Sequence, residues 1–398
     1  MSRRWNGRPL PRALPLLLTA GLLAGGVLPS TASAQRPQGP PAADEPPVVI
    51  DHADEIRRVV EGDSLTYYLE GNVRAHREAV QIRSRQATIY RRSRVADFQR
   101  DVHFWDRTTE IYADRVVYDE ETNIAHATGR VQLIDRESGS QVAADTVDYF
   151  RDEERLVARP RPHGVILPRD SLAGEPFDIY ADEMRLHSDS LATTVVAVDS
   201  VLIERADLTA VGDSLFYDED EGRIALRIRP RVETAETFLT AERIDVLLVE
   251  EEISALVARD RARAITKTDS IPAAVPAAFD DVSRTSFLEG DSLYIAFAAE
   301  GIDWLVAEGD ARSLNYTRES PAGPIETWSV NYLLGERLRL SFSGDSLTVV
   351  VASGGHRGIY RSEEVRVGGP VRRESEPIPL MDLTAAVHAG RRSGSSTW

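Results

Sequence analysis

The sequence of 398 residues contains no cysteine. Disulfide frameworks, thiolate metal sites, cysteine nucleophiles and a lipid anchor on an N-terminal cysteine are therefore excluded. The Gly-x-Ser-x-Gly, phosphate-loop and His-Glu-x-x-His motifs are also absent, and the eight histidines show no ligand spacing. These absences predict a protein that is not an enzyme and that uses neither a metal nor a cofactor.

Basic residues are in the minority, with 47 Lys and Arg against 64 Asp and Glu and a formal net charge of −17. The first 34 residues hold four arginines and no acidic residue, so their removal would take the charge to −21. Nucleic acids and anionic membranes are bound by basic surfaces. We therefore expect no nucleic-acid partner, whereas a hydrophobic fraction of 42% is sufficient for a folded protein.

Long apolar runs are missing except between Ala13 and Leu28, where the run follows four arginines and precedes the small residues Ala32 to Ala34. This order is typical of an export signal and predicts cleavage near Ala34/Gln35. The run has about 16 residues, short of the roughly 20 that span a bilayer, so a retained anchor is the weaker alternative. Residues 35–50 are rich in proline and predict an extended linker.

A short phrase recurs nine times: a small residue, an acidic anchor, a polar residue, an apolar residue, a variable residue and an apolar residue. In every copy the positions two and four residues after the anchor are apolar or aromatic, and the position directly after the anchor is polar. One anchor is basic, Arg85. The others are Asp63, Asp114, Asp145, Asp182, Asp213, Glu242, Asp291 and Glu336.

The period of two within each phrase predicts a half-buried β-strand. A polar turn follows each phrase, and a returning strand follows the turn, as in Ile124 to Ala127 and Leu347 to Val351. Many returns end in a breaker, a polar residue and an apolar residue, such as Gly129-Arg130-Val131, which suits a bend between two sheets. We therefore expect an all-β protein with two facing antiparallel sheets in an elongated stack.

The spacing of the phrases predicts the domain organisation. Repeats occupy residues 51–265 and 287–371, with a Pro- and Ala-rich insertion at 266–286 and a flexible tail at 372–398, after a signal peptide at 1–34 and the linker at 35–50. Because the insertion interrupts the repeats, one body and two lobes both stay open at this point.

The repeats resemble a known family. Tyr112 to Tyr118, Ala127 to Val131 and Gly212 to Tyr217 are similar to the repeat of OstA-like proteins, the periplasmic lipopolysaccharide-transport components that include LptA, LptC and the N-terminal jellyroll of LptD. The similarity runs from about Asp51 to Arg357. It implies a stacked β-jellyroll whose apolar groove carries lipopolysaccharide acyl chains toward the outer membrane, and a periplasmic location for the mature chain.

The resemblance also implies partners and a candidate site. The partners would be lipopolysaccharide and other jellyroll domains of this kind, or the chain itself, joined by edge-strand pairing. LptA-like and LptC-like roles both stay open. The groove would be lined by the apolar repeat positions Val116, Tyr118, Val147, Tyr149, Met184, Leu186, Leu215, Tyr217, Ile244 and Val246.

Two other classes of function compete with lipid transport. The same apolar columns would form the closed core of a structural or adhesive β-repeat protein of the cell envelope. A solenoid hydrolase acting on polysaccharide would need a local pair of carboxylates. The acidic anchors instead recur in almost every repeat, where a solvated bend explains them without chemistry, so the enzymatic interpretation is the weakest of the three.

Overall fold

The structure is a computed structural model that describes residues 46–167, 175–188, 193–235, 237–250, 252–266, 285–298, 301–318, 325–343 and 346–366. The segments predicted as signal peptide and tail, residues 35–45 of the predicted linker and most of the insertion lie outside these residues. One compact unit, Pro46–Trp398, contains all of the described strands. No helix in the described ranges is long and apolar enough to cross a membrane.

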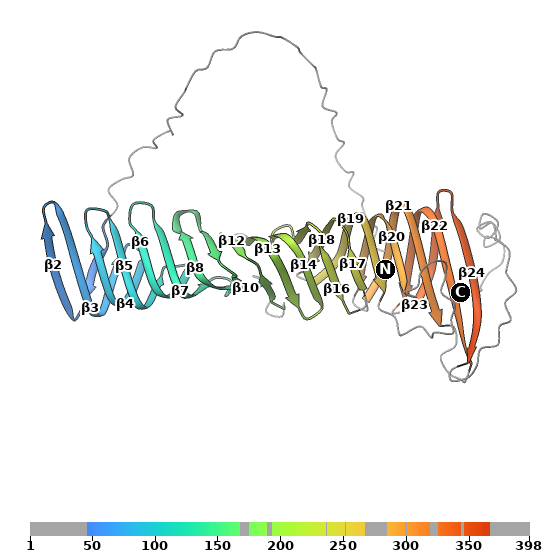
Figure 1. Cartoon of the computed structure of the whole chain (residues 1–398), viewed down its shortest axis with the longest axis horizontal. Coiled ribbons are helices and arrows are strands. Elements are labelled where there is room, and N and C mark those ends of the chain that lie inside the picture. Colours follow the sequence, from blue (N-terminus) through green and yellow to red (C-terminus); the bar gives the residue numbers. More distant parts are fainter. Residues whose placement is uncertain are drawn as a thin grey trace, which may run out of the picture. The chain divides into compact units, whose positions relative to one another are not determined.

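The described chain is built almost entirely of β-strands, which confirms the predicted all-β class (Figure 1). The single helical turn among these residues is the 3-10 turn η1, Arg151–Glu153. The N-terminal strands are β1 (Val49–His52), β2 (Glu55–Glu61), β3 (Ser64–Arg77), β4 (Val80–Tyr90), β5 (Val95–Trp105), β6 (Thr109–Asp119), β7 (Ile124–Asp135), β8 (Gln141–Phe150), β9 (Arg155–Arg159), β10 (His163–Ile166), β11 (Phe177–Tyr180) and β12 (Glu183–Ser188).

The remaining strands continue the same pattern to the end of the described chain. They are β13 (Thr193–Arg205), β14 (Leu208–Asp218), β15 (Arg223–Arg227), β16 (Arg231–Thr234), β17 (Thr237–Thr240), β18 (Arg243–Val249), β19 (Glu252–Thr266), β20 (Ser286–Ala298), β21 (Gly301–Arg318), β22 (Ile325–Ser343), β23 (Ser346–Ser353) and β24 (Arg357–Arg366).

Each long strand belongs to two layers. The first half of β14 pairs with β16 and its second half pairs with β15, and both pairings are antiparallel. All described strands join one hydrogen-bonded network. Each repeat of the stack, called a rung here, bends sharply near its middle. These bends, called corners, divide the network into two facing layers. The centroids of Phe104 in one layer and Tyr118 in the other are 5.6 Å apart, so the layers pack directly on each other.

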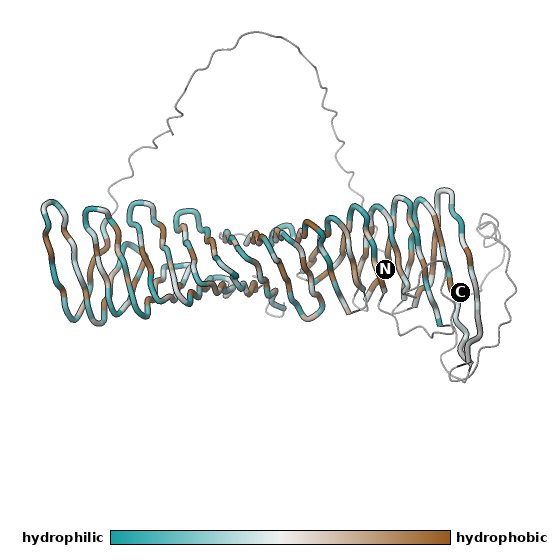
Figure 2. Tube along the Cα trace, in the orientation of Figure 1, coloured by the Kyte–Doolittle hydropathy of each residue, from teal (hydrophilic) through white to brown (hydrophobic). Residues whose placement is uncertain are grey.

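Hairpin turns form two rows at the free margins of the layers, opposite the corners. Turn row A comprises residues 91–94, 120–123, 151–154 and 219–222. Turn row B comprises residues 78–79, 106–108, 136–140 and 206–207. The gap between these two rows, opposite the corners, is called the mouth here, because no strand of the described chain passes from one layer to the other there. Figure 2 shows hydrophilic residues at the turns and hydrophobic residues within the strands.

The corners are built from pairs of residues in the left-handed conformation. At one of them Gly129 and Arg130 have φ angles of 77° and 47°, and the register between β7 and β8 shifts there, between Thr128 and Val131. Such bulges bend a strand sharply. The predicted bends at the ends of the returns are thereby confirmed. Equivalent pairs are Gly71–Asn72, Arg100–Asp101, Asp199–Ser200, Ile228–Arg229, Asp260–Arg261 and Gly309–Asp310.

Most of the repeat anchors lie at these corners, in agreement with the solvated bend expected from the sequence. Asp63 instead lies in the hairpin turn before β3, and Asp182 and Glu242 directly precede β12 and β18. Asp114, for example, lies in the middle of β6. It forms a salt bridge with Arg130, the second left-handed residue at the corner of the adjacent strand β7. Hydrogen bonding to Arg130 holds the pKa of Asp114 below its usual value. At most corners a small residue precedes the anchor where the layers converge; a Cβ at Gly290 would lie 2.9 Å from the carbonyl oxygen of Glu308.

The core runs between the layers without a break at the insertion. Strands β19 and β20, on either side of it, pair directly from Ala255↔Ala296 to Thr266↔Ser286. One buried apolar cluster extends from Val48 to Leu340, and a smaller second cluster contains Trp328 and Val330. The repeats on both sides of the insertion therefore form one body in the described chain. Strand β1 begins at Val49, inside the segment expected as linker.

Candidate functional site: the interior and its mouth

The ten predicted groove residues all lie in the interior between the layers. None of them is more than 6% exposed, and Val116, Tyr118, Val147, Met184, Ile244 and Val246 are fully buried. The column directly after the anchors faces outward instead: the side chain of Arg115 is 53% exposed and pairs with Asp97 at 2.8 Å. The alternation predicted from the sequence therefore places the apolar columns inside, where they pack against the opposite layer in this structure.

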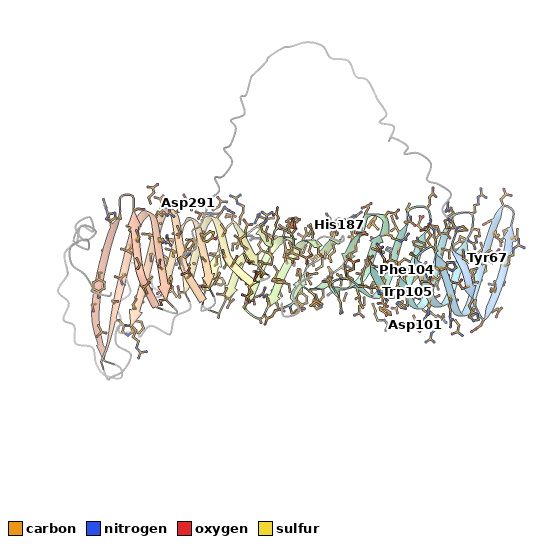
Figure 3. The ribbon with its side chains drawn as sticks, turned by 180° about the vertical axis from the view of Figure 1, so that it is seen from behind. Tyr67, Asp101, Phe104, Trp105, His187 and Asp291 are labelled. Atoms are coloured by element: carbon orange, nitrogen blue, oxygen red, sulfur yellow. The ribbon has the colours of Figure 1, made fainter. Side chains whose placement is uncertain are left out.

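Figure 3 marks the two faces on neighbouring residues of β5. The side chain of Phe104 is fully buried among the interior residues. Trp105 points to the other face, where its ring stacks on His103 with a centroid distance of 4.2 Å. Adjacent residues thus separate an apolar interior from a polar and aromatic exterior, as the pleat of a strand requires.

Tyrosines occupy the last interior position before turn row A in several rungs. Tyr118 and Tyr149 are the two best buried of them, with rings in the apolar interior and hydroxyls directed at the mouth. A buried tyrosine hydroxyl needs a hydrogen-bond partner. In both cases that partner comes from the opposite margin, so the tyrosines connect the two layers at the mouth.

A buried arginine supplies the first of these partners. Arg77, at the end of β3 beside turn row B, is only 1% exposed. Its Nη1 donates to the Tyr118 hydroxyl at 2.8 Å and also to Oδ1 of Asn123 in turn row A. Its Nε donates to the carbonyl of Pro46 at 2.9 Å. Tyr118 in turn donates to Asn123 Oδ1 at 2.8 Å, which closes a three-membered network across the mouth.

The second cluster lies one rung further along. Tyr149 donates to Oδ2 of Asp106 in turn row B at 3.3 Å and accepts from the hydroxyl of Thr109 at 3.1 Å. Arg151 in turn row A lies 3.7 Å from both Asp106 and Glu78, each of which belongs to turn row B. The two rows are thus joined by polar contacts over successive rungs.

Burial fixes the protonation of both tyrosines. Desolvation raises the pKa of Tyr118, although the nearby Arg77 charge opposes the rise. Desolvation and the Asp106 carboxylate raise the pKa of Tyr149 to about 12. Both hydroxyls therefore stay neutral at physiological pH and remain available as donors.

Beyond the second cluster the margins enclose a small cavity of about 30 Å³. It is lined on the side of turn row B by residues that include Thr109 and Ser140, and from the other layer by Tyr149, Leu186 and Thr193. The packing at the mouth is therefore incomplete where β8, β12 and β13 approach turn row B.

The acidic anchors form no catalytic group in the described structure. They belong to separate rungs, and several are held by the basic residue across the corner, as Asp213 is by Arg229 and Glu242 by Arg261. Among the described residues, no group of three or more histidines or carboxylates is arranged to hold a metal ion. The anchors thus have a structural role in the bends.

Sequence reasoning missed the polar clusters at the mouth. A signal for the first cluster was present, because Arg77 continues the buried alternation of Val73 and Ala75 and is a charged residue at an interior position. The second cluster gave no comparable signal, since Asp106 and Thr109 belong to a polar turn like many others in the chain.

Comparison with known protein families gives a match for the first part of the repeats. Residues 45–157 match the family of OstA-like proteins, which confirms the predicted resemblance over that segment. The chain is also similar to the solved structure of LptH from Pseudomonas aeruginosa, described as the LptA homologous periplasmic component of the lipopolysaccharide transport device, with 16% identity, a TM-score of 0.25 and coverage of 28% of this chain and 77% of that chain. None of the curated proteins compared with the chain matches it.

Proposed function

We propose that the mature protein is a periplasmic carrier of lipopolysaccharide-type lipids that holds acyl chains between its two β-layers. The observation that carries the proposal is the continuous apolar interior that runs from Val48 to Leu340 in one cluster. The family match of residues 45–157 supports it, and the signal sequence is consistent with export.

A wall of apolar side chains is enough for this task. Burial of an acyl chain contributes about 0.8 kcal/mol per CH₂ without a directional contact. Positions such as Val147 and Leu215 would contact the chain, while the outward column would not. In the described structure the two layers touch, so the chains would have to displace the opposing side chains by separating the layers at the mouth.

The charge of the chain is consistent with a lipid whose phosphorylated headgroup stays outside. The formal net charge is −17, and it becomes more negative when the signal segment is removed. A surface of this sign repels phosphate groups. It would therefore favour a bound state in which only the hydrocarbon part enters the protein.

Both ends of the stack expose strand edges that could receive partner strands. In the described chain β2 pairs only with β3, and its residues Ile56 and Val60 are 53% and 57% exposed. At the other end β23 pairs only with β22 and exposes Val349, Val350 and Val351. Unpaired edges of this kind bind further strands. We therefore include other jellyroll domains, or a second copy of the chain, among the partners.

A second candidate is a structural or adhesive cell-envelope protein. The specific observation in its favour is the packing itself, because Val116, Val147 and Met184 are fully buried against the opposite layer. A permanently closed core would have this appearance. The two candidates differ in whether the layers separate in the presence of lipid.

Co-purification tests the proposed function directly. The exported protein should be isolated from the envelope with lipopolysaccharide bound, and the delipidated protein should bind added lipopolysaccharide at a stoichiometric ratio. A protein that remains free of lipopolysaccharide in both experiments would support the structural candidate instead. The matched control is an acidic, exported β-protein of similar size that has no interior apolar cluster of this length.

A further inference from the structure

The two polar clusters at the mouth form a feature that the carrier function alone does not require. We name them the clasp, which consists of Arg77, Asp106, Thr109, Tyr118, Asn123 and Tyr149. Each cluster joins a tyrosine from the layer beside turn row A to groups from the layer beside turn row B. The clasp therefore closes the mouth over the rungs from β3 to β8.

The clasp differs from an ordinary surface network in its burial. Arg77, Asn123 and Asp106 are 1%, 4% and 7% exposed. Burial of such groups costs free energy unless hydrogen bonds compensate it. Some of the compensating bonds cross between the margins: Arg77 donates to Tyr118 and Asn123, and Tyr149 donates to Asp106. Others stay on one margin, since Asp106 also accepts from the Thr109 backbone and Asn123 donates to Asp152. Separation of the margins would break the crossing bonds while leaving the strand pairing of each layer intact.

The geometry of the rungs allows this separation. The layers are joined at the corners, and the mouth lies at the opposite margin, so an opening motion would be greatest at the clasp. Net hydrogen-bond energies are small, because water replaces each lost partner when a polar contact opens. A polar clasp can therefore open reversibly, whereas an apolar seal would expose hydrocarbon surface to water.

The clasp ends where the mouth becomes less tightly packed. The cavity of about 30 Å³ lies between the margins directly after Tyr149, which also forms part of its lining. The mouth thus changes along the stack, from closed rungs at the N-terminal side to incompletely packed rungs near Leu186 and Thr193.

We propose that the clasp is a latch that controls lateral access to the interior between β3 and β8. Hydrocarbon reaches these rungs from the side only when the two clusters part, and otherwise enters them along the interior from the neighbouring rungs. This inference rests on the proposed function, because a latch is useful only if the interior admits a ligand. It assigns to Arg77 and Tyr118 a gating role in addition to their contribution to stability.

The absence of native cysteine provides a test that needs no lipid. A Val116→Cys variant places one thiol beneath the first cluster, and a Leu256→Cys variant places one at a fully buried position in β19, outside the clasp. The rate at which a small thiol reagent labels each position reports local opening under native conditions. The full mature chain is used throughout.

Each thiol is then combined with substitutions of the clasp. Arg77→Leu removes the donor of the first cluster, and Tyr118→Phe removes only one hydroxyl, so the milder variant keeps the test valid if the stronger one does not fold. The matched control is Arg115→Leu, which removes an arginine–carboxylate pair on the outer face of the same strand as Val116.

We expect Arg77→Leu to raise the labelling rate at position 116 by about tenfold or more, because the substitution removes the charge-assisted hydrogen bonds from Arg77 to Tyr118 and Asn123 that cross the mouth. Tyr118→Phe should raise it by a smaller factor, and the rate at position 256 should not change. Unchanged rates at position 116, or equal increases at positions 116 and 256, would overturn the latch. Either result is independent of lipopolysaccharide capture, so failure of the latch is distinguishable from failure of the carrier function.

Discussion

The hydroxyl of Tyr149 donates a hydrogen bond to Asp106 Oδ2 across the mouth, at 3.3 Å. Desolvation, together with the negative charge of Asp106, raises the pKa of this tyrosine from 10.0 to about 12. A folded-state pKa above the unfolded value gives stability that is complete below the unfolded pKa and is lost as pH rises through the folded pKa. Tyr149 therefore links the closed mouth to alkaline stability.

We predict that the protein loses stability between about pH 10 and pH 12, with up to about 3 kcal/mol of the loss due to Tyr149. The measurement is urea denaturation of the wild type and of Tyr149→Phe across this range. The variant should lose less stability than the wild type on going to high pH. Parallel curves for the two proteins would show that Tyr149 does not couple to folding.

A second prediction concerns the corners. Gly129 has a φ of 77°, and a Cβ there would lie 2.6 Å from Oδ2 of Asp114. Gly129→Ala should therefore cost about 2 to 3 kcal/mol of unfolding free energy. Gly62, at a φ of 57°, has no atom within 4 Å of the equivalent Cβ, so Gly62→Ala should cost only about 1 kcal/mol for the left-handed backbone.

Both glycines have left-handed backbone. The difference in unfolding free energy between the two variants therefore measures the contact with Asp114 and not the cost of the backbone conformation. Equal losses of stability would mean that the approach of Asp114 to the corner contributes nothing. A larger loss at Gly62 would contradict the assignment of Gly129 to a tightly packed bend.

A third prediction concerns the free edge at β2. Ile56→Lys places a charge on an exposed edge strand and should weaken self-association or partner binding by about tenfold or more, with little effect on folding. Val211→Lys is the matched control, since Val211 is 38% exposed but belongs to β14, which is paired on both sides. Analytical ultracentrifugation across a concentration series measures the effect. Equal weakening by both variants would exclude β2 as the contact.

The repeat explains why much of this fold could be predicted. Period-two alternation places Val116 and Leu215 inside and Arg115 outside, and the structure agrees at each of these positions. The basic anchor Arg85 was the exception in the sequence. At its corner the two charges are exchanged: the anchor Arg85 is basic, its partner Asp101 is acidic, and they form a salt bridge at 2.6 Å.

Other features could not be obtained from the sequence pattern. The sequence pattern could not separate anchors that precede a strand, such as Asp63, from anchors inside one, such as Asp114, because a mid-strand bulge shifts the alternation by one residue, as a turn would. Asp106 and Tyr149 are 43 residues apart and meet only when the two layers fold onto each other. The pattern also could not distinguish an open groove from a packed interior, because an apolar strand face looks the same in either case.

The central claim is that acyl chains enter the space between the layers. Site-specific photocrosslinking tests it with pairs of adjacent positions that differ only in the face they occupy. A photoreactive residue at Val116 or Leu215 should capture lipopolysaccharide, and one at Arg115 or Ser214 should not. Equal capture from both faces, or no capture from either, would contradict the carrier function and leave the interior as the closed core of a structural protein.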